Sequence, residues 1–119
     1  MKSEIKESFD KILEEAREAA LKASIECIPE PMQMMGSIVR DGVCGFAWVN
    51  IPGRGNFAKY AKEYLGASKN YGGKGFNIWY SEFYKGGTQS YERHLAACRA
   101  ASEVLQKHGI KSQAAGRLD

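Results

Sequence analysis

The segment from Gly42 to Asn56 (GVCGFAWVNIPGRGN) constrains the fold more than any other part of the chain. Its first part, Val43 to Ile51, carries no charge, and both of its alternating sets of side chains are mainly apolar. Such a run is typical of a central strand that is covered on both faces. Pro52 and two glycines then interrupt the strand, and a helical pattern follows. We therefore predict a buried strand, a glycine turn and the start of a helix.

Length and composition indicate one soluble domain. A chain of 119 residues has the size of a single domain, and its hydrophobic fraction of 44% can supply a packed core. The formal charge of +3 suits contact with phosphate, but it is well below that of a dedicated nucleic-acid binder. No apolar run approaches the roughly 20 residues of a membrane helix. The three cysteines lie far apart without a C-x-x-C pair, which favours a reducing, cytoplasmic setting.

The first part of the chain predicts a long amphipathic helix over residues 3 to about 27. Ser3 is a candidate N-cap, and Pro29 and Pro31 end the helix. Apolar residues recur at steps of three and four along one face: Ile5, Phe9, Ile12, Leu13, Ala16, Ala20 and Ala23. Two interpretations remain open. The helix packs on its own domain, or it forms a dimer or partner contact.

The remaining segments predict alternating strands and helices. Ser37–Val39 and Val43–Ile51 are expected to pair as a hairpin, because Asp-Gly follows a β-branched run. The later elements are a helix from Phe57 to a stop at Gly66, a loop over 67–75, a strand Phe76–Phe83, a helix from Thr88 or Ser90 to His108 with a Gly109-Ile110 stop, and a strand Ile110–Ala115.

This order predicts an α+β fold. Helices between strands favour a two-layer sandwich, in which a small mixed or antiparallel sheet carries its helices mainly on one face. An N-terminal amphipathic helix over residues 1–28 is added to a core at 37–119, within a single domain overall. The strand order stays open.

The best candidate for a binding site is the glycine turn itself. Glycines at Gly53 and Gly55 let a phosphate approach the backbone, and free N–H groups near Asn56 at a helix start attract anions. Arg54 would add a bidentate charged partner. Lys74 lies in the second glycine-rich segment, GGKG at 72–75, and is expected to reach the same ligand.

Two further residues extend this prediction. Trp79 is a strand aromatic near lysines, which is the arrangement that base stacking needs. Arg117 lies in the Arg-Leu-Asp end of the chain and would bring a guanidinium to one edge of the sheet. The pattern is neither a Walker loop nor a dinucleotide fingerprint, so it does not specify one ligand.

Catalytic residues, metal ligands and cofactors are not predicted. His94 and His108 fall at opposite ends of one helix and cannot share a metal ion. Cys44 lies in an apolar strand, which indicates a buried, inert thiol, and Cys98 on a helical core stripe suggests the same. Only Glu82, Glu92 and His94 would support an enzyme.

Several motifs occur together in the second part of the chain: CGFAWV at 44–49, WYSEF at 79–83, QS at 89–90, GI at 109–110 and RLD at 117–119. Together they resemble a group of small uncharacterised bacteriophage proteins over roughly residues 37–119. The group ends in Gly-Ser-Arg-Met/Leu-Asp, whereas this chain has Ala115 and Gly116 before the arginine. The resemblance implies a phage origin and the host cytoplasm, and it implies no reaction.

Two functions follow as expectations. The first is a non-enzymatic phage accessory protein that holds a nucleotide or nucleic acid on a basic glycine-turn face. The alternative is a protein–protein adaptor or inhibitor of a host protein, with the N-terminal helix as the contact of a homodimer. No membrane partner is expected.

Overall fold

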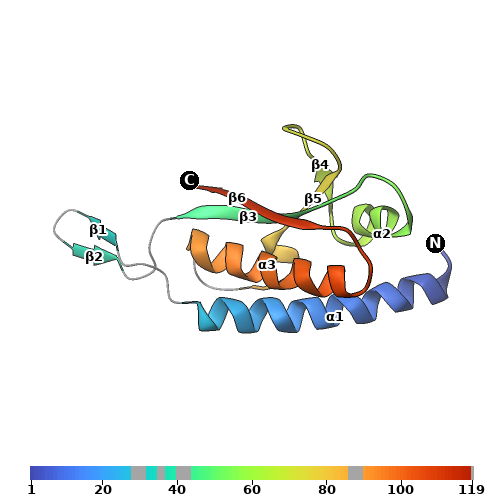
Figure 1. Ribbon diagram of the computed structural model, residues 1–119, viewed down its shortest axis with the longest axis horizontal. Coiled ribbons are helices and arrows are strands. Elements are labelled where there is room, and N and C mark those ends of the chain that lie inside the picture. The colour runs from blue at the N-terminus through green and yellow to red at the C-terminus, as the bar shows by residue number, and fades with distance from the viewer. Residues whose placement is uncertain (28–31, 35–36, 40–43, 86–89, 119) are drawn as a thin grey trace.

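The computed structural model describes residues 1–27, 32–34, 37–39, 44–85 and 90–118. Figure 1 shows a sheet on one side, α3 against it, and α1 along the outer side of α3. The helices are α1 (Ser3–Glu26), α2 (Asn56–Tyr64) and α3 (Tyr91–Lys107), with a 3₁₀ turn η1 (Tyr80–Glu82). The strands are β1 (Met32–Met34), β2 (Ser37–Val39), β3 (Gly45–Ile51), β4 (Ser68–Lys69), β5 (Phe76–Trp79) and β6 (Gln113–Leu118).

The main sheet has the strand order β4-β5-β3-β6, and every neighbouring pair is antiparallel. From β3 onwards the chain runs β-α-β-β-α-β, which is the connectivity of the split βαβ, or ferredoxin-like, arrangement. The predicted α+β fold is therefore confirmed, and α1 and α3 lie on one face of the sheet (Figure 1).

β3 is the central strand, as predicted, but only one of its faces is covered. Gly45, Ala47, Val49 and Ile51 are buried on the side of α3, whereas Phe46, Trp48 and Asn50 are half-buried on the other side. The expectation of two covered faces was wrong. Both helices that pack over the sheet lie on one side of it, so large aromatic residues on the other side only partly cover one another.

The predicted β2–β3 hairpin is also wrong. β2 pairs with β1 in a separate two-stranded sheet, with Gln33 opposite Ile38. β6 pairs with β3 along residues 45–50 on one edge and β5 along residues 48–51 on the other, so these neighbours take the place that β2 was expected to fill. The predicted turn at 40–42 lies outside the described residues.

α1 packs on its own domain. Leu13, Ala16 and Ala20 are fully buried where α1 lies along α3. The small side chains of Ala16 and Ala20 lie within this helix–helix contact. Lys2 rather than Ser3 is the N-cap, and no side chain caps this end. Pro29 and Pro31, which were predicted to end the helix, lie outside the described residues. Cys27 forms the C-cap.

Both ends of α3 follow local sequence signals. The Ser90 hydroxyl caps the helix by accepting a hydrogen bond from the backbone N–H of Arg93, while Thr88 lies outside the described residues. At the other end Gly109 has φ of +80°, and the N–H of Ile110 donates to the carbonyl of Leu105. This is the predicted Schellman stop.

Two strands differ from their predicted limits. β5 ends at Trp79, because η1 follows directly and turns the chain. Phe83 and Tyr84, which come after η1, are buried. β6 begins at Gln113 rather than Ile110, since Ile110 is still engaged in the helix stop.

Candidate functional site: a cationic pocket at the end of β3

The glycine turn connects β3 to α2 over residues 52–55. Gly55 has φ of +96° and is the N-cap of α2, and no side chain of the described residues caps this helix end. Gly53 passes over the Phe76 ring of β5, where a Cβ atom would lie 3.3 Å from the ring edge. Lys62 covers the same ring, with its Nζ atom 4.6 Å from the centroid. The glycine turn therefore packs against the Phe76 side chain of β5.

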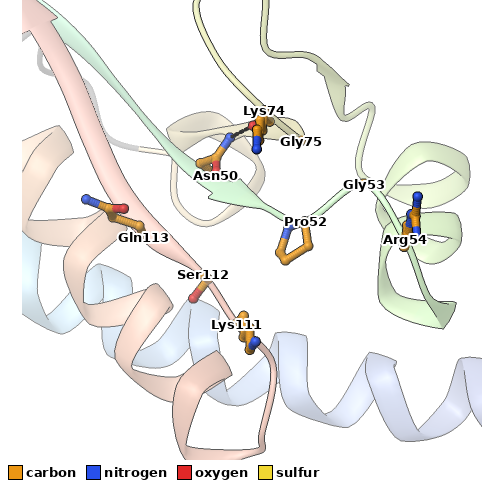
Figure 2. Close-up of a pocket in the computed structure, with 9 residues that line it drawn as sticks. All are labelled: Asn50, Pro52, Gly53, Arg54, Lys74, Gly75, Lys111, Ser112 and Gln113. Atoms are coloured by element: carbon orange, nitrogen blue, oxygen red, sulfur yellow. Dashed lines mark hydrogen bonds between the residues drawn. The ribbon is translucent and has the colours of Figure 1, made fainter.

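The second glycine-rich segment rests against the end of β3. Gly75 has φ of +82°, and a Cβ atom there would lie 2.0 Å from the carbonyl oxygen of Ile51. Only glycine fits such an approach. The side-chain amide of Asn50 donates to the carbonyl of Lys74 at 3.0 Å (Figure 2). The side-chain amide of Asn70 donates to the same carbonyl at 3.3 Å. The backbone of Lys74 is thus held in place.

These two segments meet the start of β6 around a pocket of about 510 Å³. Figure 2 shows Pro52 in its centre, between Lys74 and Lys111, with Arg54 to one side. The nine lining residues are Asn50, Pro52, Gly53, Arg54, Lys74, Gly75, Lys111, Ser112 and Gln113. Three cations therefore reach one pocket from three separate parts of the chain, and none of its described lining residues is acidic.

The charge around the pocket is one-sided. Residues 45–55, 66–79 and 109–118 contain the bases Arg54, Lys69, Lys74, Lys111 and Arg117 and no acidic residue. α1, on the far side of α3, contains seven acidic residues and four basic ones. Among the described residues, no acidic side chain forms an ion pair with any of the three pocket cations. Their charge is available to an anion.

A second pocket of about 410 Å³ adjoins the first and shares Pro52, Arg54 and Lys111 with it. Gly55 and Asn56 line this second pocket. The four predicted turn residues therefore divide between two adjacent pockets, and Arg54 belongs to both.

The structure places Arg54 and Lys74 on one pocket and separates two other predicted residues from them. Trp79 and Arg117 do not line the pocket; they lie on the open face of the sheet, opposite Trp48 and Phe46 respectively. Sequence reasoning missed Lys111, Asn50 and Gln113. Asn50 gave a signal, because it is the polar residue in an otherwise apolar strand.

Both histidines have structural partners. His94 is buried and shares a hydrogen bond with the Tyr84 hydroxyl. His108 Nε2 lies 3.0 Å from Glu15, and hydrogen bonds from Lys107 and His108 lower the pKa of that carboxyl. In the described part of the chain, no group of three or more His, Cys, Asp or Glu is placed to hold a metal ion.

The cysteines differ in their surroundings. Burial raises the pKa of Cys98 to about 12, so this thiol is inert as predicted. Cys44 is exposed, so its predicted burial was wrong. It precedes β3, forms an isolated bridge with Ser90, and by the alternation of the strand falls on the same side as Phe46 and Trp48.

Searches against protein-family models, curated proteins and solved structures find no match for this chain. Within the described residues, none of the helices is long and apolar enough to cross a membrane.

Proposed function

We propose that this protein is a binding protein without catalytic turnover, and that its cationic pocket holds a phosphate-bearing ligand, either a nucleotide or a nucleic acid. The convergence of Arg54, Lys74 and Lys111 around one pocket, with no acidic residue among its described lining residues, carries this proposal. The phage origin and host cytoplasm implied by the sequence motifs remain part of it as expectations.

Geometry supports the choice of ligand class. A volume of about 510 Å³ is in the range of small-molecule sites. Arg54 can pair with two phosphate oxygens through its planar guanidinium, and Lys74 and Lys111 act as point charges. The hydrogen bonds from Asn50 and Asn70 hold the Lys74 backbone before a ligand arrives. A fixed backbone lowers the ordering cost of binding.

Thermal melts at two salt concentrations test the proposal, with tripolyphosphate, ATP and a single-stranded oligonucleotide as probes. We expect at least one probe to raise the melting temperature, because a ligand that binds only the folded state stabilises it. The increase should be smaller at high salt, since exposed charges are screened.

A pair of charge-reversal variants makes the test specific. Arg54→Glu with Lys74→Glu should abolish the increase. Lys11→Glu with Lys22→Glu on α1 changes the net charge equally and should retain it. If no probe stabilises the wild-type protein, or if both double variants respond alike, the pocket is not a phosphate site.

The alternative function is a protein–protein contact through α1. Leu21 and Ile25 lie one helical turn apart on α1 and are 47% and 68% exposed, although α1 packs on α3 along another face. We propose these two residues as the contact of an adaptor, an inhibitor of a host protein or a homodimer.

Light scattering compares the wild type with the double variant Leu21→Ser/Ile25→Ser. A fall from dimer to monomer would support a homodimer, whereas a wild-type monomer would rule it out and leave a host protein to be sought by pull-down with both forms.

A further inference from the structure

The open face of the sheet carries a cluster of three aromatic side chains. Trp48 of β3 lies directly opposite Trp79 of β5, and their ring centroids are 5.7 Å apart. Phe46 is two residues before Trp48 on the same face, and its ring centroid lies 5.9 Å from that of Trp79. Both contacts are edge-to-face, with interplanar angles of 68° and 85°. This aromatic cluster occupies the two central strands of the sheet.

The aromatic cluster is accessible. Trp79 is 38% exposed, and Phe46 and Trp48 are half-buried. Figure 1 shows α1 and α3 on the opposite side of the sheet. The buried side of β3 faces α3, where Gly45 and Gly116 leave room for the Tyr91 ring. The large aromatic rings therefore lie on the face that the helices leave open. Packing alone would call for apolar residues on the other face, which α3 covers.

The same face connects the aromatic cluster to the pocket. Asn50 follows Trp48 on this face, pairs with Asn77 of β5 and Gln113 of β6, and lines the pocket. The side-chain amide of Asn50 donates to Asn77 Oδ1 at 2.9 Å. From Phe46 to Asn50 the strand rises about 13 Å at its usual spacing. The surface thus changes from aromatic to amide to cationic along one strand.

Charge on this face favours an anionic partner. Arg117 of β6 lies opposite Phe46 and is exposed, so a cation stands beside the aromatic cluster as well as in the pocket. The four strands of the sheet contain no acidic residue, and of their two basic residues Arg117 lies on this face, whereas Lys69 is paired with Phe76 and falls on the other. An apolar peptide or a lipid tail would use the rings alone, whereas this pattern offers rings and cations together.

We propose that the open face binds single-stranded nucleic acid, with bases stacked on Trp48 and Trp79 and phosphates held by Arg117 and by the pocket cations. Unpaired bases expose the flat faces that aromatic side chains can contact, whereas a duplex hides them. Exposed aromatics on a four-stranded antiparallel sheet are one established platform for such stacking. The inference rests on the proposed function of the pocket, and it selects a nucleic acid over a free nucleotide.

Tryptophan fluorescence tests this inference directly, because Trp48 and Trp79 are the two tryptophans of the chain. Titration with oligo(dT) or oligo(rU) of about ten nucleotides should quench the emission to saturation. A duplex containing the same strand should cause little quenching. Comparison of the two single strands shows whether DNA or RNA binds more tightly.

The Trp79→Leu variant should bind the oligonucleotide about 5- to 150-fold more weakly, which is the loss of one stacked base. Tyr64→Leu is the matched control, because Tyr64 is a similarly exposed aromatic residue on α2 (40%). This variant should bind the oligonucleotide with the affinity of the wild type. If Trp79→Leu does not fold, Arg117→Glu should weaken binding instead. Circular dichroism confirms the fold of each variant.

Tripolyphosphate, which has a charge but no base, separates the two proposals. Trp79→Leu should bind it as the wild type does, and Arg54→Glu with Lys74→Glu should not bind it. If tripolyphosphate binds but oligonucleotides bind no more tightly and quench nothing, the pocket proposal stands and the stacking inference is wrong. If the charge reversals leave both probes unaffected, the pocket proposal is wrong.

Discussion

The Tyr84 hydroxyl and the His94 Nδ1 atom share a hydrogen bond inside the core. His94 is 1% exposed, and the Tyr80 ring stacks on its imidazole with the centroids 3.7 Å apart. Burial lowers the pKa of His94 below its ordinary value, and burial raises the pKa of Tyr84 to about 12. Both groups are therefore neutral at pH 7, and the hydrogen bond joins uncharged partners.

This burial predicts that the protein loses stability in mildly acidic solution. Below about pH 6.5 the unfolded chain protonates His94 while the folded protein keeps it neutral, so the unfolded state binds more protons. The free energy of unfolding should therefore fall as the pH decreases, with a slope of at most about 1.4 kcal/mol per pH unit for this group. Urea denaturation at pH 7.5, 6.5 and 5.5 measures it.

The control removes the other histidine. In His108→Gln, His94 is the remaining histidine of the chain, so the pH dependence in this window reports on it. Asp10 and Glu15, whose pKa values are lowered by hydrogen bonds, stay ionised down to pH 5.5. A stability that is unchanged between pH 7.5 and 5.5 in His108→Gln would contradict the assignment of a neutral buried imidazole.

Gly75 should not tolerate a side chain. Gly75→Ala would place a methyl group 2.0 Å from the Ile51 carbonyl oxygen, in a backbone conformation that L-residues rarely adopt. We expect a loss of about 1–3 kcal/mol, measured by urea denaturation, together with weaker binding at the pocket because the Lys74 segment must shift. Gly72→Ala in the same loop is the control, since its nearest neighbour is 4.0 Å away. It should change stability by less than about 0.5 kcal/mol.

Much of the fold could be predicted because its signals are local. The apolar stripe of α1, the Ser90 cap and the glycine stop at Gly109 depend on residues a few positions apart. Strand pairing depends on competition between distant segments instead. The Asp-Gly signal favoured a β2–β3 hairpin, but β5 and β6 occupy both edges of β3. The sequence also does not predict that one face of β3 is uncovered. An aromatic residue counts as apolar in a sequence pattern, whether its ring packs on a helix or faces solvent.

The site was predicted in part. Arg54 and Lys74 stand out because glycines flank both residues, and the structure brings them to one pocket. Lys111 lies between Ile110 and Ser112, without flanking glycines that would single it out in the sequence. It joins the pocket because the Schellman stop at Gly109 directs the chain back along β3, which is a property of the packed sheet and not of the lysine. Trp79 and Arg117 were chosen for their chemistry, and the register places them on the open face rather than in the pocket.

The packing of α1 on α3 predicts that α1 is an integral part of the domain. Leu13 is fully buried there, so Leu13→Ala should lower the free energy of unfolding by about 2–5 kcal/mol. Leu21→Ala removes the same atoms from an exposed position of the same helix and should cost about 0.5 kcal/mol or less. Chemical denaturation of the two variants gives both values. Equal effects would mean that α1 is only loosely attached.

Lys111 offers a test of the pocket that does not depend on abolishing binding. If its charge neutralises one phosphate of a bound single strand, Lys111→Gln should reduce the slope of log affinity against log salt by about 0.7. Lys22→Gln removes the same charge from α1, on the far side of α3, and should leave the slope unchanged. Fluorescence titrations with oligo(dT) at several salt concentrations measure both slopes. A wild-type slope in Lys111→Gln would exclude this lysine from the phosphate path, while Arg54 and Lys74 would remain candidates.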